Sequence, residues 1–194
     1  TEIAFRAAFK AILSGKQVAM LCPTTLLARQ HYLTAQERFK NYGVRIRLLS
    51  RLVSDSEANQ TLKDLANNHV NLIIGTHRLL SKDIVFKDLG LLIVDEEHKF
   101  GVEHKEKIKE MKQSVDVLTL SATPIPRTLA HTIYGDLDIS IIDELPPNRK
   151  KIETYAVTKG MEQRVNNFIL KNVEEGRQCY VVCPLVEENE EIDA

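Results

Sequence analysis

The stretch that decides the fold is Leu89-Gly90-Leu91-Leu92-Ile93-Val94-Asp95-Glu96-Glu97-His98-Lys99-Phe100-Gly101. Four consecutive apolar residues, two of them β-branched, run directly into adjacent acids. This pattern is typical of a strand that is buried on both faces and ends in a polar site. Because ligands of open α/β sheets bind at the carboxyl ends of the strands, Asp95 and Glu96 are the first candidates for a functional site.

Two adjacent carboxylates can divide the work of nucleotide hydrolysis. One holds a Mg²⁺ ion that bridges nucleotide phosphates, and the other orients or deprotonates the attacking water. Asp95 and Glu96 are the candidates for these two roles. An apolar run followed by Asp-Glu also describes a strand exit with solvated acids, so this motif alone leaves both interpretations open.

Composition limits the class of protein. The 194 residues suffice for one large domain or for one domain and part of another, and 43% of them are hydrophobic. The 26 basic and 27 acidic residues nearly cancel, so contacts with nucleic acid would have to come from local patches. No apolar run has the length of a membrane span, and the N-terminus has no signal-peptide pattern. We expect a cytoplasmic protein without membrane contact.

The three cysteines Cys22, Cys179 and Cys183 form no Cys-x-x-Cys pair and leave one thiol unmatched. This usage indicates a reducing compartment and buried structural thiols, in preference to disulfides or a zinc site.

Strand and helix signals alternate along the chain. Helices are expected at 1–13, 24–42, 54–67 and 103–113, and strands at 17–23, 44–50, 70–77, 89–95 and from 115, with a helix to about 134 beyond two prolines. The helix at 103–113 has charges of mixed sign, which favours a solvated face. The alternation predicts an α/β fold with a parallel sheet and helices on both faces.

Other predicted strands also end in polar turns. Hydroxyl groups at 24–25, 76 and 121–123 follow three of them, and hydroxyls and backbone amides at such turns can hold the phosphates of a nucleic acid. An ordinary helix cap explains each turn by itself. Unrelated helix caps are a poor explanation for polar turns after all three strands.

These motifs resemble those of the superfamily-two helicases and DNA translocases, and within them the pair formed by the transcription-repair coupling factor (Mfd) and RecG. The residues concerned are 23–31, 75–80, 95–98 and 121–128, which resemble motifs Ia, Ib, II and III. The sequence of residues 1–101 resembles the coupling factor more closely, and that of residues from 129 onward resembles RecG more closely. A divergent member of the pair and a mosaic both stay open.

The resemblance implies a RecA-like motor that uses ATP and Mg²⁺. Asp95 would hold Mg²⁺, Glu96 would polarise the hydrolytic water, and His98 would help relay the nucleotide state to the DNA-binding face. Thr1 would be the final residue of motif I, where its hydroxyl meets both the nucleotide and Mg²⁺. The preceding Gly-Lys would lie just upstream of this sequence.

The resemblance also implies contacts with double-stranded or branched DNA, made to phosphates and therefore insensitive to sequence. The residues concerned are Thr24, Arg29, Thr76, His77 and Arg78. Three others, Ser121, Thr123 and Arg127, would couple hydrolysis to movement. RNA polymerase would be a further partner if the chain is of the coupling-factor kind. For His77 and His98, a hydrogen-bonded loop histidine stays an open alternative.

The sequence predicts three segments: a first RecA-like motor domain at 1–142 that lacks its P-loop strand, a linker at 143–151, and the truncated start of a second RecA-like domain at 152–194. In the third segment we expect a strand at 152–157, a helix at 161–173 and a strand at 178–185. About 40 residues cannot bury a complete core. Without the P-loop lysine and second-lobe arginines, we expect little or no ATP hydrolysis by this chain alone.

The function implied is therefore that of a motor fragment from a DNA helicase or translocase that acts in repair and recombination, either in RecG-like fork reversal or in Mfd-like transcription-repair coupling. A catalytically inactive nucleic-acid-binding module derived from a helicase is the main alternative. A nucleotide kinase or GTPase could also place Asp-Glu after a buried strand. The polar turns at 75–77 and 121–123 weigh against that third possibility, because such enzymes need no surface facing a nucleic acid.

Overall fold

The computed structural model describes residues 1–111, 114–122, 138–144 and 151–182. Contacts divide the chain into two compact units, Thr1–Leu137 and Asp138–Ala194. The predicted linker at 143–151 lies mostly outside the described residues, so its boundaries stay a prediction.

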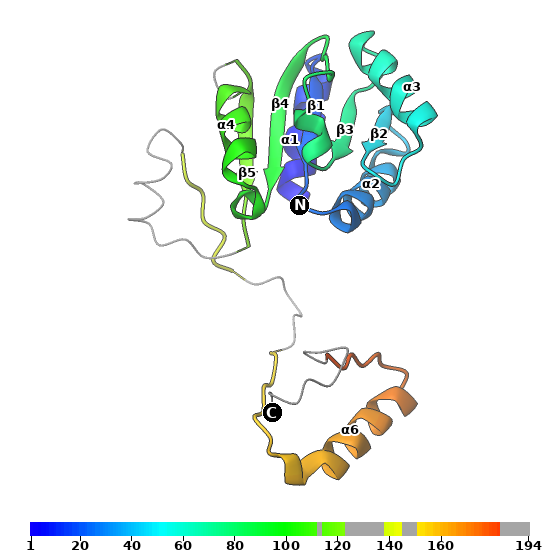
Figure 1. Ribbon diagram of the computed structural model, residues 1–194, viewed down its shortest axis with the longest axis vertical. Coiled ribbons are helices and arrows are strands. Elements are labelled where there is room, and N and C mark those ends of the chain that lie inside the picture. Colours follow the sequence, from blue (N-terminus) through cyan, green and yellow to red (C-terminus); the bar gives the residue numbers. More distant parts are fainter. Residues whose placement is uncertain (112–113, 123–137, 145–150, 183–194) are drawn as a thin grey trace. The chain divides into compact units, whose positions relative to one another are not determined.

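The first unit is built on a five-stranded parallel sheet, in the order β2-β3-β1-β4-β5 (Figure 1). The strands are β1 (Gln17–Leu21), β2 (Ile46–Leu49), β3 (Leu72–Gly75), β4 (Leu89–Asp95) and β5 (Asp116–Leu120). All five residues of β1 are buried, as are Leu91 to Val94 of β4. The predicted parallel α/β sheet is confirmed.

Helices cover both faces of this sheet, because alternate residues of each strand point to opposite sides. Val18 and Met20 of β1 pack on one side against α1 (Glu2–Leu13) and α2 (Thr25–Phe39). Ala19 and Leu21 pack on the other side against α3 (Asp55–Ala66), the 3₁₀ turn η1 (His77–Leu80) and α4 (Val102–Met111). The prediction of helices on both faces is therefore confirmed.

The helix starts follow ordinary capping chemistry. The Thr24 hydroxyl accepts a hydrogen bond from the Leu27 amide at 3.2 Å, and the Ser54 hydroxyl accepts one from the Glu57 amide at 3.3 Å. The predicted helices at 1–13 and 54–67 match α1 and α3 closely, whereas α2 ends at Phe39, earlier than expected.

Strand register brings the polar turns to one edge of the sheet. Leu21, the last residue of β1, pairs with Gly75 in β3 and with Val94 in β4. Asp95 pairs with Leu120 at the end of β5. The turns that follow these four strands therefore leave the sheet at the same edge.

The second unit contains the 3₁₀ turn η3 (Lys159–Met161) and α6 (Glu162–Glu174), which confirms the helix predicted at 161–173. The strand predicted at 152–157 was wrong, because residues 151–158 adopt no regular structure. A strand needs a hydrogen-bonded neighbour. Residues 177–182, the described part of its expected partner at 178–185, adopt no strand either, and 183–185 lie outside the described residues.

The cysteines only partly follow the prediction. Cys22 is fully buried, but Cys179 is exposed, contrary to the expectation of buried thiols, and Cys183 lies outside the described residues. Cys179 follows the end of α6 in the second unit, where the residues around it are exposed. Among the described residues, no helix combines the length and the apolar character needed to cross a bilayer.

Candidate functional site

Asp95 and Glu96 lie at the carboxyl end of β4, directly after the fully buried Ile93 and Val94. Their side chains are 16% and 17% exposed. Both carboxylates are thus largely withdrawn from solvent at the edge where the polar turns gather. An ionised carboxylate in such a place needs hydrogen bonds or a cation to offset the lost hydration.

Asp95 receives such a hydrogen bond from α2. Nε2 of His31 lies 2.8 Å from Oδ2 of Asp95, and the His31 side chain is 8% exposed. His31 has no role among those predicted from the sequence. A helical signal could have revealed it, since His31 shares the buried stripe of α2 with Ala28, Ala35 and Phe39.

Glu96 has a left-handed backbone, with φ of 52° and ψ of 51°. A non-glycine residue in this region costs about 1–3 kcal/mol, and such strain is often found at active sites. Two backbone hydrogen bonds hold the conformation: the Glu96 amide donates to Leu120 O at 2.9 Å, and the Lys99 amide donates to Glu96 O at 2.9 Å. These bonds fix the backbone from which the Glu96 side chain projects.

The Glu96 carboxylate lies between two partners. Its Oε1 accepts from the Ala122 amide at 3.4 Å, and its Oε2 lies 3.3 Å from Nδ1 of His98. His98, which belongs to the 3₁₀ turn η2 (Glu97–Lys99), is therefore in contact with the proposed water-polarising residue. The structure brings together Glu96, His98 and the turn that follows β5.

Glu97 was not singled out by the sequence analysis. Its side chain is buried, and its Oε2 has no hydrogen-bond partner among the described residues. The signal was present in the sequence, because Glu97 is the third acid of the run that follows β4.

Thr1 occupies the N-cap position of α1 and is exposed, and its side chain makes no capping hydrogen bond. A short turn joins α1 to the start of β1, and the helix packs antiparallel to that strand. The first residue of α1 therefore lies toward the carboxyl edge of the sheet, the edge that also holds Asp95.

The residues expected to contact DNA do not all reach the surface. Thr24 and Arg29 on α2 are exposed, and so is His77. Thr76, the N-cap residue of η1, is only 5% exposed, so little of its side chain is open to a partner, and its contact with DNA stays a prediction. The His77 ring lies 5.4 Å from that of His104 on α4.

Arg78 is half-buried and paired. Its Nη1 donates to Oδ1 of Asp83 at 2.7 Å, and Nη2 donates to the second carboxylate oxygen. These hydrogen bonds lower the pKa of Asp83 below its usual value and raise that of Arg78. The guanidinium charge is therefore partly neutralised within the protein.

Ser121 is exposed directly after β5, as the strand pattern predicted. Thr123 and Arg127 lie outside the described residues, so their predicted coupling role stays untested.

Cys22 follows β1 at the same edge. Burial, together with the negative charge of Asp95, raises the pKa of its thiol to about 12. The Cys22 amide donates to Gly75 O at 2.8 Å, which ties the exit of β1 to the end of β3. The Cys22 thiol therefore stays protonated beside the candidate carboxylate.

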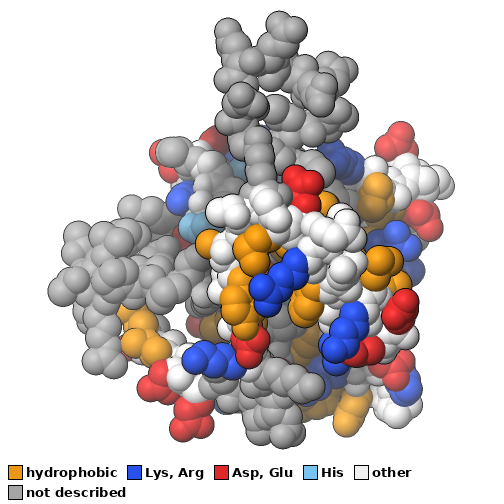
Figure 2. All heavy atoms as spheres, turned by 90° about the horizontal axis from the view of Figure 1, so that it is seen from below, with side chains coloured by type: hydrophobic (Ala, Val, Ile, Leu, Met, Phe, Trp, Pro, Cys, Tyr) orange, Lys and Arg blue, Asp and Glu red, His pale blue; other side chains and the backbone are white. Residues whose placement is uncertain are grey.

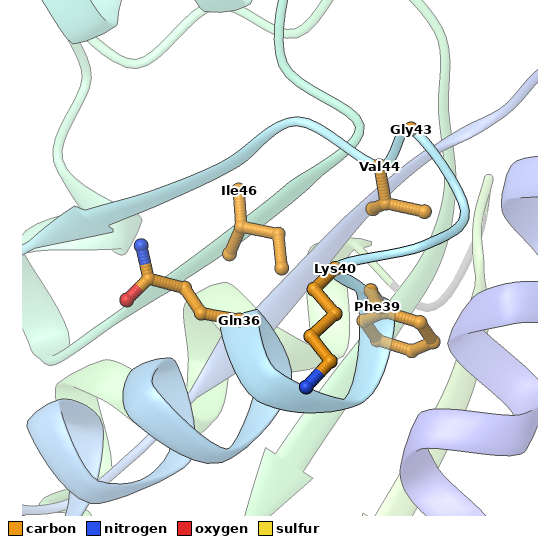
Figure 3. A pocket seen from close by; sticks show the side chains of 6 residues that line it. All are labelled: Gln36, Phe39, Lys40, Gly43, Val44 and Ile46. Carbon is orange, nitrogen blue, oxygen red and sulfur yellow. The ribbon is translucent and has the colours of Figure 1, made fainter.

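A pocket of about 200 Å³ lies elsewhere, between the end of α2 and β2 (Figure 3). Its lining contains no carboxylate: Gln36, Phe39, Lys40, Gly43, Val44 and Ile46. Because α2 begins at the carboxyl edge of the sheet, its last turn lies toward the opposite edge. This pocket is separate from Asp95 and Glu96.

Charges of both signs are interspersed on one face of the molecule (Figure 2). Lys and Arg side chains are dispersed among acidic and hydrophobic ones on the face shown in Figure 2. Contacts with a polyanion would thus depend on individual cations such as Arg29, as the balanced composition indicated.

A family model described as DEAD/DEAH box helicase matches residues 1–132, the part that contains the sheet and its polar edge. The chain belongs to the DEAD/DEAH box helicase family. This family membership confirms the resemblance to superfamily-two helicases that was drawn from the motifs.

Individual relatives of this helicase chain agree with that result. The chain is 55% identical over 190 residues to a transcription-repair-coupling factor of Bacillus subtilis and 54% identical over 174 residues to one of Staphylococcus haemolyticus, covering 98% and 90% of this chain. It spans only 16% and 14% of the length of these relatives. The Bacillus subtilis relative thus aligns both with residues 1–101 and with residues from 129 onward, the two stretches predicted to resemble different proteins.

A structure of RecG bound to a three-way DNA junction is also similar, with a TM-score of 0.77 and 38% identity. The similarity covers 96% of this helicase chain and 25% of the RecG chain. The described sheet therefore has the RecA-like fold of a known helicase, as predicted.

The donor set at the polar edge suits Mg²⁺. Mg²⁺ prefers oxygen ligands and is usually held by one or two carboxylates together with substrate phosphates and water. Asp95 supplies a carboxylate whose Oδ2 is engaged by His31, and its second oxygen, Oδ1, is the candidate ligand for a cation. Thr1 supplies a hydroxyl at the same edge.

Proposed function

We propose that this chain is the nucleotide-hydrolysing part of an ATP-dependent motor that moves on double-stranded or branched DNA. The observation that carries the proposal is the Asp95-Glu96 pair, withdrawn from solvent at the carboxyl end of β4 in a chain of the DEAD/DEAH box helicase family. A RecG structure bound to a DNA junction supports the choice of substrate.

In this proposal Asp95 and Thr1 hold Mg²⁺, which when bound neutralises the charge that develops on the phosphates. Asp95 contributes a carboxylate oxygen that the end of a buried strand holds in place. A ligand positioned in this way needs little reorganisation during the reaction, which is how a preorganised site lowers a barrier.

Glu96 orients the attacking water in the same proposal and draws a proton toward its carboxylate. The left-handed turn and the Ala122 amide hold Glu96 in one orientation. His98 contacts the opposite carboxylate oxygen, so a change in the charge on Glu96 is felt directly by η2. This contact gives a physical route by which hydrolysis can alter the neighbouring turns.

Thr24, Arg29, His77 and Arg78 are proposed as contacts with DNA phosphates. Arg29 is exposed on the helix that also holds His31, and His77 is exposed on η1. Contacts of this kind add affinity that is independent of sequence and falls with salt. For Thr76, which is only 5% exposed, a contact with DNA stays a prediction.

Similarity favours a role in transcription-repair coupling over RecG-like fork reversal. Identity is 55% to a coupling factor and 38% to RecG, each over nearly the whole chain. On this proposal RNA polymerase is a partner, as the resemblance implied. The motor would work in the cytoplasm, where bacterial DNA is found.

The test measures DNA-stimulated ATP hydrolysis by this chain and by an extended protein, which carries the flanking sequence found in the relatives on both sides. Removal of a positioned general base typically lowers a rate by about 10²–10⁴-fold, so Glu96→Gln should abolish most of the activity of the extended protein. Glu103→Gln, an exposed acid on α4, serves as the matched control.

Stimulation by DNA that is lost in Glu96→Gln and kept in Glu103→Gln would support the motor. If the extended protein bound DNA but never hydrolysed ATP, a catalytically inactive binding module would replace it.

A further inference from the structure

The described contact between His31 and Asp95 joins three elements at one point. His31 lies on α2, Asp95 ends β4, and the His31 ring makes an edge contact with Phe5 of α1, with ring centroids 6.4 Å apart and an interplanar angle of 84°. We propose that His31 is a positioning residue: it fixes the orientation of the Asp95 carboxylate toward Mg²⁺ and links that carboxylate to the helix that carries Arg29. This inference rests on the proposed function.

The Asp95 carboxylate can rotate unless a partner restrains it. The terminal torsion of an aspartate side chain is broad, so the carboxylate of a free Asp95 would sample many orientations. A donor 2.8 Å from Oδ2 restricts that rotation and leaves Oδ1 directed elsewhere. Residues that orient a metal ligand in this way commonly change metal affinity or activity by about 10–100-fold when they are replaced.

The His31 donor is itself held in place by packing. His31 is buried and held against Phe5, which is itself 2% exposed and contacts Phe39 at the end of α2. The imidazole therefore cannot move without the packing between α1 and α2 moving as well. A donor fixed by packing can position its acceptor, whereas a mobile surface donor cannot.

His31 also links Asp95 to Arg29, the candidate contact with DNA. Arg29 precedes His31 by two residues on α2, so the two side chains point to different sides of the helix, one exposed and one buried. A shift of α2 on binding a phosphate at Arg29 would move His31 relative to β4. Because a hydrogen bond of 2.8 Å weakens within a few tenths of an ångström, such a shift would alter how Asp95 is held.

The alternative interpretation is that His31 is a core histidine whose only role is to donate a hydrogen bond to a buried carboxylate. Two substitutions separate the interpretations. His31→Gln keeps a side-chain N–H donor able to reach Asp95, and His31→Phe keeps the aromatic packing against Phe5 without a donor. If the role of His31 is purely structural, these substitutions should change the stability of the fold and leave Mg²⁺-dependent binding unchanged.

The experiment measures binding of a fluorescent, non-hydrolysable ATP analogue to the extended protein as Mg²⁺ is varied, with thermal unfolding as the measure of folding. We expect His31→Phe to raise the Mg²⁺ concentration for half-maximal binding by about tenfold or more. We expect His31→Gln to stay within about threefold of the unsubstituted protein, by the same reasoning. His69→Phe, at an exposed histidine after α3, is the matched control and should change nothing.

If His31→Phe fails to fold, His31→Asn replaces it, because its amide is too short to reach Asp95 and the same increase is expected. An unchanged Mg²⁺ dependence in the folded variant that lacks the donor would overturn the role of His31 and leave the motor intact. Nucleotide binding by the unsubstituted protein that ignores Mg²⁺ would overturn the proposed function and this inference together.

Discussion

A Cβ atom placed on Gly75 would lie 2.3 Å from the backbone oxygen of Leu49 and 2.9 Å from Cγ of Leu79. Gly75 ends β3, and Leu49 ends the adjacent strand β2, so the clash is with backbone that the sheet holds in place. We predict that Gly75→Ala lowers the free energy of unfolding by about 1–3 kcal/mol, the usual cost of overpacking. Denaturant unfolding of the chain would measure it.

Gly101→Ala is the matched control, since a Cβ atom there meets nothing within 4 Å and Gly101 has no left-handed backbone. A loss of stability as large in Gly101→Ala as in Gly75→Ala would mean that the close approach to Leu49 is not the cause.

The sheet and its polar edge could be predicted because their signals are local. Apolar runs, helix caps and the acids after β4 are each contained in a few residues, and the parallel order follows from their alternation. The contact between His31 and Asp95 could not be read in this way, because it joins residues 64 positions apart and depends on how α2 is rotated on the sheet.

Other features depend on surroundings that a sequence pattern does not contain. Glu96 adopts a left-handed backbone although glycine is the residue favoured there, because Leu120 and Lys99 supply its hydrogen bonds. The alternation at 152–157 resembled a strand, but a strand forms only with a neighbour, and the described residues supply none in the second unit.

Gln17 satisfies four backbone groups from a fully buried position. Its Nε2 donates to Leu65 O at 2.9 Å and to Val70 O at 3.1 Å, and its Oε1 accepts from the amides of Lys87 and Asp88 at 2.8 and 3.0 Å. Gln17→Met keeps the size of the side chain and removes the partner of Val70 O and of the Lys87 and Asp88 amides, whereas Leu65 O still accepts from the Asn68 amide at 3.2 Å. We predict a loss of about 3 kcal/mol or more in unfolding free energy, since each orphaned buried group costs about 1–3 kcal/mol.

Chemical denaturation would measure the Gln17 effect, with Gln30→Met on the exposed side of α2 as the control. Equal stability of Gln17→Met and the unsubstituted chain would show that water satisfies the orphaned groups as well as the Gln17 amide does.

Cys22 should make stability depend on pH in the alkaline range. Burial, with a contribution from Asp95, raises its pKa from 9.0 to about 12, so the folded protein retains this proton where the unfolded chain loses it. The stabilisation is complete below pH 9 and is lost as the pH rises from 9 toward 12. The unfolding free energy should therefore fall more steeply across this range than in Cys22→Ala.

Denaturant unfolding at several pH values would measure the unfolding free energy of the unsubstituted protein and of Cys22→Ala. The difference between the two values removes the contributions of all other titratable groups, because both proteins share them. At pH 8 iodoacetamide should modify the exposed Cys179 and spare Cys22. Parallel stability curves for Cys22→Ala and the unsubstituted protein would contradict the prediction.

Arg29 and Arg78 should differ in what they contribute to DNA binding, because among the described residues Arg78 forms an ion pair and Arg29 does not. Arg29→Ala should weaken binding of the extended protein to any DNA sequence and reduce the slope of log affinity against log salt by about 1. Arg78→Ala should reduce that slope by less, because Asp83 already shares its charge. Asp83→Asn should strengthen binding, since it releases the Arg78 guanidinium for a phosphate.

Fluorescence anisotropy of labelled duplexes at several salt concentrations would measure these slopes. Arg47→Ala is the control, because Arg47 lies within the edge strand β2, beside Asp64, and outside the polar turns. If Arg29→Ala lowers the slope and Arg47→Ala does not, the phosphate contacts lie on α2 and not on β2. A slope lowered equally by both substitutions would indicate that DNA binding depends on net charge alone. The assignment of α2 to the DNA-facing surface would then fail.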